Sequence, residues 1–407
     1  MRGAAPTVTP GDVLQLVRDG EASSRADVAR LTGLSRTAVA ARVDALVEAR
    51  LVTETESPGI GVGRPPKRLE FEAGAGLVLA AAIGRSRAQF TVCDLAGLVL
   101  GADELEQEIG LGPDDVLPRA VGRLRALLLR LGRAPADVLG IGVSIPGTVD
   151  PVAGTSLNSA IMRGWNGVPI APYFAALSPA PVVIENDTNV IALAEFDTHL
   201  TRYQDALIVK ASTGLGAAIV AGGKLQHGAR GAAGDIGHVK YRGANDLPCR
   251  CGDTGCLEAV AGGWALVRDL AAHGREVAHV RDVVTLALQG DVVARRAIRG
   301  SGQAIGEVLA AAVTLLDPAV IVVGGDMAPA YELLVAGLRE TLYRDASTVA
   351  ARDLDVLAAS HGADSGARGT AVLALRRVLS PRAVDDRLGL GITSGITRPR
   401  SPLRAAT

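Results

Sequence analysis

The sequence predicts an α/β protein preceded by a small, mainly helical domain, and two patterns carry this prediction. Between residues 10 and 50, apolar residues recur at helical spacing in three short segments. From Gly76 onward, short apolar runs typical of buried strands alternate with longer helical segments. At 407 residues, of which 48% are hydrophobic, the chain is long enough for two or three domains with large cores.

The first domain is expected to span residues 1–72 and to contain a helix-turn-helix. Its second helix is predicted from Arg25 to Leu31 and its third from Arg36 to Ala49, joined by a glycine-containing turn. Ser24 and Ser35 stand where N-caps are needed, because a serine hydroxyl accepts a bond from the first turn of a helix. In this motif the second of the two helices enters the DNA major groove by its N-terminal end.

A basic hairpin is predicted to follow these helices. Strands are expected over residues 51–54 and 69–71, and the segment 59–68 between them resembles the wing of winged-helix repressors. Side chains at the helix start and in the wing are placed to contact base edges and phosphates. These candidate DNA-binding residues are Ser35, Arg36, Thr37, Arg42, Arg64, Lys67 and Arg68. The alternative is a small protein-interaction bundle with its arginines on a solvated face.

The alternating pattern of the second domain extends from about residue 75 to 380. Buried strands are predicted at 77–83, 138–145, 181–184, 206–210, 217–221 and 320–323, and helices near 116–131, 188–197, 264–272, 281–289 and 301–315. Residues 381–407, rich in Arg, Pro, Ser and Gly without periodicity, predict a disordered tail with no function of its own.

Three of the four cysteines, Cys249, Cys251 and Cys256, fall within eight residues, and His238 precedes them by eleven positions. Three thiolates and one imidazole form a complete tetrahedral ligand set for a structural zinc ion. The alternatives are a disulfide or a chance cluster. We expect a cytoplasmic protein with reduced cysteines and no membrane contact, because the sequence contains no signal peptide and no apolar run of membrane-spanning length. The net charge of −1 means that any DNA binding must come from a local basic patch.

Around the cysteines, the sequence resembles the ROK family, which comprises repressors, open reading frames and sugar kinases. The family carries a Gly-Glu-x-Gly-His block followed by Cys-x-Cys-Gly-x-x-Gly-Cys-x-Glu, and the chain has Gly234-Asp235-Ile236-Gly237-His238 and then Cys249 to Glu258. Asp235 replaces the family's glutamate and is one methylene shorter. The resemblance extends in pieces from about 75 to 378. It implies a two-lobed actin/hexokinase-type fold with a cleft between lobes of roughly 75–197 and 198–380.

The resemblance also indicates that the nucleotide half of this cleft has been lost. Sugar kinases of the family end their first strand in Asp-x-Gly-Gly-Thr, whose aspartate helps to position magnesium and phosphates. The chain has Ala82 and Arg85 at the aspartate and second-glycine positions. Without the carboxylate there is no anchor for the metal, so we expect no phosphotransfer activity. Two further glycine loops, 212–216 and 323–326, resemble the second phosphate loop and the adenosine-side turn.

The sugar half of the cleft matches the family better. Glu185-Asn186-Asp187-Thr188-Asn189 fits a Glu-Asn-Asp-x-Asn block in which the aspartate is the general base and the preceding asparagine binds the sugar. The resemblance assigns sugar contacts to Gly147, Asn186, Asp187, Asp235, His238 and Glu258, and leaves Asp187 as a vestigial base. The alternatives are a simple strand-end turn with a helix cap at Asn186-Asp187, and a solvent-exposed helix cap at Glu258.

Together these features predict a sugar-responsive transcriptional regulator, most specifically a repressor, that binds operator DNA as a homodimer or a dimer of dimers. Its effector would be a sugar or a sugar phosphate. The second hypothesis is a bifunctional sugar kinase with a DNA-binding arm. A DNA-independent scaffold built on an inactive kinase is a third, which leaves the basic wing unexplained.

Overall fold

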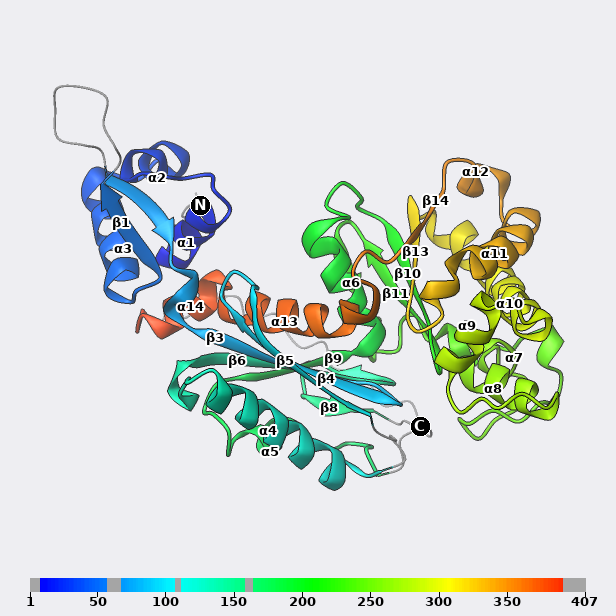
Figure 1. The fold of residues 1–407 in the computed structure, drawn as a ribbon. Helices are drawn as coiled ribbons and strands as arrows, with labels where there is room; N and C mark the ends of the chain where they lie inside the picture. The colour runs from blue at the N-terminus through cyan, green and yellow to red at the C-terminus, as the bar shows by residue number, and fades with distance from the viewer. Residues whose placement is uncertain (1–7, 57–66, 107–110, 158–163, 391–407) are drawn as a thin grey trace, which may run out of the picture. The chain divides into compact units, whose positions relative to one another are not determined.

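The computed structural model describes residues 8–56, 67–106, 111–157 and 164–390. It divides into two compact units (Figure 1). The terminal unit combines Met1–Ala75 with Arg376–Thr407, and the central unit is Gly76–Leu375. Within the described ranges, none of the helices is both long enough and apolar enough to cross a bilayer.

The first part of the terminal unit is a helix-turn-helix followed by a hairpin, as predicted. Its elements are α1 (Pro10–Arg18), α2 (Arg25–Thr32), α3 (Arg36–Glu48), β1 (Val52–Glu56) and β2 (Lys67–Phe71). Ser24 and Ser35 cap α2 and α3 by accepting from the backbone nitrogens of Asp27 and Ala38. Gly33 ends α2 with a φ of +70°, a conformation that favours glycine. β1 and β2 pair antiparallel; the wing tip between them, including Arg64, lies outside the described residues.

A helix stands where the disordered tail was predicted to begin, so that prediction is wrong for residues 381–387. α14 (Pro381–Arg387) packs against α1, and Ser380 caps it. The carboxylate of Asp385, which is 5% exposed, accepts a hydrogen bond of 2.9 Å from the backbone nitrogen of Gly11. The helix gave no clear sequence signal because only two turns with one buried apolar side chain, Val384, are needed to hold it there.

The central unit contains two five-stranded sheets with the same topology. In each, the first strand pairs antiparallel with the second and parallel with the fourth, giving the orders β5-β4-β3-β6-β9 and β12-β11-β10-β13-β14. The first sheet consists of β3 (Leu77–Ile83), β4 (Arg87–Asp94), β5 (Val99–Glu106), β6 (Val138–Ile145) and β9 (Val182–Asn186). The second consists of β10 (Ala206–Ala211), β11 (Leu215–Ala221), β12 (Lys224–Gln226), β13 (Val320–Gly324) and β14 (Asp355–Ala358).

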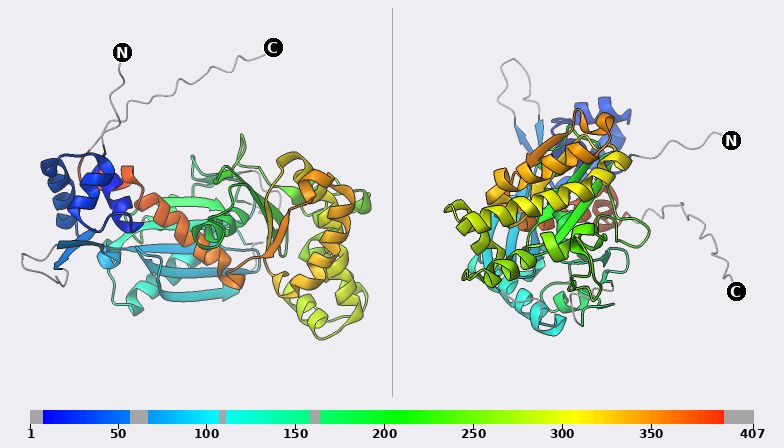
Figure 2. Two further views of the ribbon diagram at one scale, coloured as in Figure 1. Left: turned by 90° about the horizontal axis from the view of Figure 1, so that it is seen from above. Right: turned by 90° about the vertical axis from the view of Figure 1, so that its right-hand side faces the viewer.

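Helices cover both faces of each sheet, as expected for buried parallel strands. α4 (Pro113–Arg130) and α5 (Ala171–Phe174) cover one face of the first sheet and α13 (Ser365–Val378) the other (Figure 1). α6 (Asp187–Thr198) covers one face of the second sheet. Its other face packs on a helical layer, in which α10 and α11 lie side by side (Figure 2). This layer comprises α7 (Glu258–Ala261), α8 (Gly263–Ala272), α9 (Val280–Leu288), α10 (Val292–Leu316) and α11 (Tyr331–Asp345).

The predicted lobes, roughly 75–197 and 198–380, assign two helices to the wrong sheet. α6 precedes the first boundary but packs on the second sheet, and α13 lies in the second segment but packs on the first sheet. The two helices meet where Gly369 comes so close that an added Cβ would lie 1.7 Å from the carbonyl oxygen of Val190. Small residues permit this crossing, which strand and helix patterns do not reveal.

The contact between α1 and α14 gives a prediction with an unusual sign. Replacing a helical glycine by alanine normally raises stability, by about 1 kcal/mol. At Gly11, however, a Cβ would lie 2.2 Å from the carbonyl oxygen of Pro381. We expect Gly11→Ala to destabilise the terminal unit by about 1–3 kcal/mol, as overpacking does.

Calorimetric unfolding of the full chain measures this effect. The matched control is Gly300→Ala in α10, where a Cβ would meet no atom within 4 Å and the usual stabilising sign should hold. A Gly11→Ala protein as stable as wild type would mean that α14 does not hold α1.

Candidate functional site: a cleft with a zinc-binding cluster

The central unit contains a cleft of about 890 Å³ between its two sheets. The carboxyl ends of the parallel strands of both sheets border it, which is where α/β proteins place their ligand sites. Every residue to which the resemblance assigns a sugar contact lines this cleft: Gly147, Asn186, Asp187, Asp235, His238 and Glu258. Ala82 and Arg85 line it as well.

His238, Cys249, Cys251 and Cys256 form a zinc-binding cluster. Their ligand atoms all lie within 4.8 Å of one another, and the Sγ atoms of Cys251 and Cys256 are 3.7 Å apart. Sulfurs each about 2.3 Å from one tetrahedral ion are separated by about that distance. The disulfide alternative is wrong, because all four cysteines are free. Burial raises the pKa of Cys249 to about 12 and raises that of Cys256, so both sulfurs need a cation to become thiolates.

Glu258, the first residue of α7, is buried with 2% exposure, so it is not the solvent-exposed cap considered as an alternative. Its carboxylate accepts bonds from the Leu215 backbone nitrogen at 2.9 Å and from Trp264 Nε1 at 3.0 Å. The guanidinium of Arg85, on the β3–β4 hairpin, is 3.3 Å away. The carboxylate is therefore held by donors from both lobes.

Asn186 and Asp187 stand at the junction of β9 and α6, and the helix-cap alternative describes Asn186 correctly. Its Oδ1 accepts from the backbone nitrogens of Thr188 at 2.8 Å and Asn189 at 3.1 Å. Its Nδ2 donates to the carbonyl oxygen of Gly147 at 2.7 Å, which ties the Pro-Gly turn to the same place. Asn186 is therefore both a helix cap and a cleft residue. Its side-chain amide bonds to backbone groups, and the residue lines the cleft.

Charged groups at and beside the predicted sugar residues set the electrostatics of the cleft. Lys210 on β10 forms an ion pair with Asp187. His227 lies 2.6 Å from Glu185, and this hydrogen bond raises the pKa of the imidazole. Burial raises the pKa of Asp235, with a further rise from nearby Glu258 that His238 opposes.

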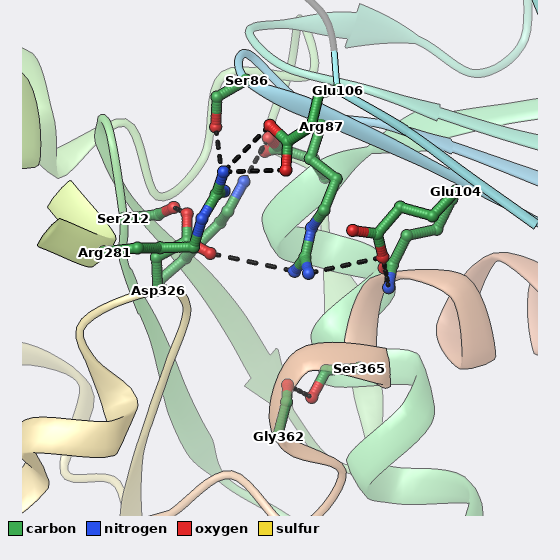
Figure 3. A network of polar contacts seen from close by, with 12 residues as sticks. Ser86, Arg87, Glu104, Glu106, Ser212, Arg281, Asp326, Gly362 and Ser365 are labelled. Carbon is green, nitrogen blue, oxygen red and sulfur yellow. Dashed lines mark hydrogen bonds and ion pairs between the residues drawn. The ribbon is translucent and has the colours of Figure 1, made fainter. Parts of the chain in front are cut away.

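Two arginines of the β3–β4 hairpin line the part of the cleft that the resemblance assigns to the nucleotide. β3 ends at Ile83, and the β3–β4 hairpin begins where the phosphate hairpin was expected. The Arg85 guanidinium lies against Gly214 of the second glycine loop, where a Cβ would be 3.2 Å from it. Figure 3 shows Arg87 of the same hairpin directed at Asp326, with 3.8 Å between them, while Asp326 also accepts from the Ser212 hydroxyl.

Sequence reasoning missed several residues that lie in the cleft or bond to its acidic groups. Lys210 carried a signal, because lysine occurs at only four positions in the sequence and a single one sits in a buried strand. Trp264 is one of two tryptophans, but nothing in its surroundings pointed to Glu258. Arg281 on α9 and His227 after β12 gave no signal, since their partners are more than 40 positions away.

The candidate DNA-binding residues differ in whether their side chains are available to contact DNA. Ser35, Arg36 and Thr37 are exposed at the start of α3. Arg42 instead donates to the carbonyl oxygens of Val8 at 2.6 Å and Ala38 at 2.9 Å, which gives it a structural role.

The two basic residues that begin β2 already have partners. Lys67 pairs with Glu54 at 3.0 Å, and Arg68 lies 3.7 Å from Glu70. Both are exposed, so these surface pairs are weak and exchange easily for phosphate.

The fold and the cluster define a two-lobed α/β protein with a zinc-binding loop beside its cleft. A helix-turn-helix precedes this protein fold in the sequence. The chain belongs to the ROK family, whose model matches residues 78–377. It is 26% identical over 344 residues to a xylose repressor of Caldicellulosiruptor bescii, covering 81% of this chain and 86% of that protein. It is 31% identical over 296 residues to an N-acetylmannosamine kinase of Escherichia coli O1:K1 / APEC, covering 70% and 96%.

Among solved structures, a ROK family transcriptional regulator described as a homologue of the E. coli Mlc protein has the same fold. Its TM-score is 0.78 at 24% identity, covering 94% of this chain and 99% of that one. The four zinc-binding side chains form the cluster typical of this family.

The cluster predicts how the metal and the fold depend on each other. Cys251→Ser should abolish zinc binding, measured as about one ion per chain in the wild type by elemental analysis, and should lower the melting temperature. Cys93→Ala, at the buried cysteine outside the cluster, is the control and should keep its zinc. A Cys251→Ser protein with a full complement of zinc would contradict the ligand assignment.

The His227–Glu185 pair predicts a pH dependence. Because the folded-state pKa of His227 is raised above its ordinary value of 6.5, the stabilisation is complete below that value and is lost as the pH rises through the folded pKa. Between pH 6 and 8, wild type should lose more thermal stability than His227→Gln, which cannot titrate. Parallel melting curves for the two proteins would exclude this contribution.

Proposed function

We propose that the chain is a sugar-responsive, DNA-binding transcriptional regulator, most specifically a repressor. The observation that carries the proposal is the capped α3 with Ser35, Arg36 and Thr37 exposed at its start, in a unit that precedes the ROK domain. The kinase relative is matched over 96% of its own length by only 70% of this chain, whereas the xylose repressor match covers 81% of this chain. The part of this chain that extends beyond the kinase match is thus covered in part by the match to a repressor.

In this proposal the cleft binds a sugar or sugar phosphate but does not phosphorylate it. Ala82 offers no carboxylate for magnesium, and Arg85 occupies the space beside the second glycine loop. Asp187, at the position of the family's general base, forms an ion pair with Lys210. Ala82, Arg85 and the Asp187–Lys210 pair thus affect the positions of the metal, the phosphates and the general base, respectively.

The proposed sugar contacts are Gly147, Asn186, Asp187, Asp235, His238 and Glu258. Bound zinc supplies a fixed orientation of the His238 imidazole, whose second nitrogen is then directed at a sugar hydroxyl. Sugar entering the cleft draws the two lobes together and changes the presentation of the DNA-binding units. A homodimer, or a dimer of dimers, would then release an operator with two half-sites spaced at whole turns of the duplex.

The decisive experiment measures operator affinity at fixed salt, with and without the sugar that raises the melting temperature most. Sugar should weaken operator binding, and by linkage operator should weaken sugar binding by the same factor. Asp187→Ala should abolish the response while leaving operator affinity without sugar intact. If this variant still binds sugar and releases DNA normally, the sensing site is elsewhere. If sugar tightens operator binding, the protein is an activator or a repressor that requires the sugar as co-repressor.

Two variants separate base readout from phosphate contact. Arg36→Ala should relax sequence preference, whereas Lys67→Ala should weaken binding to all sequences and reduce its salt dependence. A coupled assay with ATP and a panel of hexoses tests the alternative of a bifunctional kinase. Turnover that disappears in Asp187→Asn would establish that alternative.

A further inference from the structure

One oxygen of the Glu258 carboxylate is held by the backbone around it. Oε2 accepts from the Leu215 backbone nitrogen at 2.9 Å. Backbone also encloses it on two sides, because a Cβ at Gly214 would lie 2.6 Å from Oε2 and a Cβ at Gly237 would lie 3.2 Å from it. The contacts that can be exchanged are therefore those at Oε1.

Oε1 has two partners in the described structure, and one of them is fixed. Trp264 donates its Nε1 hydrogen at 3.0 Å. The indole is also held by two cations, since the guanidinium carbon of Arg250 lies 4.7 Å from the ring centre and that of Arg268 lies 5.3 Å from it. Arg250 belongs to the zinc-binding loop, so the metal cluster, the indole and the carboxylate form one connected group.

Arg85 is the partner that can leave. Its contact of 3.3 Å with Oε1 is longer than the other two, and it comes from the opposite lobe, on a hairpin rather than on the helix that carries Glu258. A long arginine side chain can swing away without moving backbone. Because the indole and the Leu215 backbone nitrogen are fixed, Arg85 is the donor that a sugar hydroxyl can replace on Glu258.

The same hairpin has further ties across the cleft (Figure 3). Ser86 accepts from Arg281 on α9 at 3.4 Å, and Arg281 also pairs with both carboxylate oxygens of Glu106 at 2.9 and 3.0 Å. Arg87 lies 3.8 Å from Asp326. These ties involve neither oxygen of Glu258, so they hold the hairpin in place whether or not Arg85 is displaced.

We propose that Arg85 is an internal competitor of the effector: it neutralises Glu258 in the sugar-free protein and is displaced when a sugar hydroxyl binds that carboxylate. Arg85 thereby sets the affinity of the cleft and releases one tie between the lobes in the same event. This inference rests on the proposed function, because it requires a sugar that contacts Glu258.

The experiment uses the full chain and calorimetric titration with the sugar that stabilises wild type most. Arg85→Met keeps a long apolar side chain but removes the competing guanidinium, so the sugar should bind about fivefold more tightly. Arg85→Lys retains a competing cation and should bind about as wild type does. The matched control is Arg87→Met on the same hairpin, which loses a charge without touching Glu258 and should change affinity less than twofold.

Several outcomes would overturn the proposal. Equal affinity of wild type and Arg85→Met would mean that Arg85 does not compete, and weaker binding by Arg85→Met would make it a direct sugar ligand. Should Arg85→Met fail to fold, Arg85→Gln supplies the same comparison with a neutral polar side chain. If no sugar in the panel binds wild type or any variant, the proposed function itself fails. That result differs from equal binding by wild type and Arg85→Met, which would overturn only the competition by Arg85.

Discussion

Burying the Glu258 carboxylate is the constraint on which the construction of the cleft depends. An unpaired carboxylate at 2% exposure would cost several kcal/mol, so three donors converge on it. One comes from the backbone of the second glycine loop, one from Trp264 beside the zinc-binding loop, and one from Arg85 on the opposite lobe. A single charge thus links the metal cluster, a phosphate-type loop and the hairpin that begins the first sheet.

Three other acidic groups in or beside the cleft also have local partners. Asp187 has Lys210, Glu185 has His227, and Asp326 has both Ser212 and Arg87. Because these three carboxylates already have a cation or donor, they offer little free charge to attract a magnesium ion.

Features specified by short stretches of sequence were predictable. The caps of α2 and α3, the strand β3 and the cysteine loop each depend on neighbouring residues, so their patterns predicted them correctly. Features that depend on distant partners were not. α14 is held by Gly11, about 370 positions away, and α13 returns to the first sheet through contacts such as Thr370 with Ser144. Arg85 was placed at the second-glycine position by the resemblance, but its partner, 173 positions away, gave no sign.

The shared topology of the two sheets explains why one substitution can alter the cleft so much. In each sheet the first strand turns into an antiparallel second strand at the cleft, producing the hairpin after β3 and the glycine loop after β10. The second loop keeps Gly214, where a Cβ would lie 2.6 Å from Glu258 and 3.2 Å from Arg85. Arg85 reaches Glu258 only because that position has no side chain. Arg85 in one loop therefore depends on Gly214 in the other, and together they allow an ion pair between the lobes.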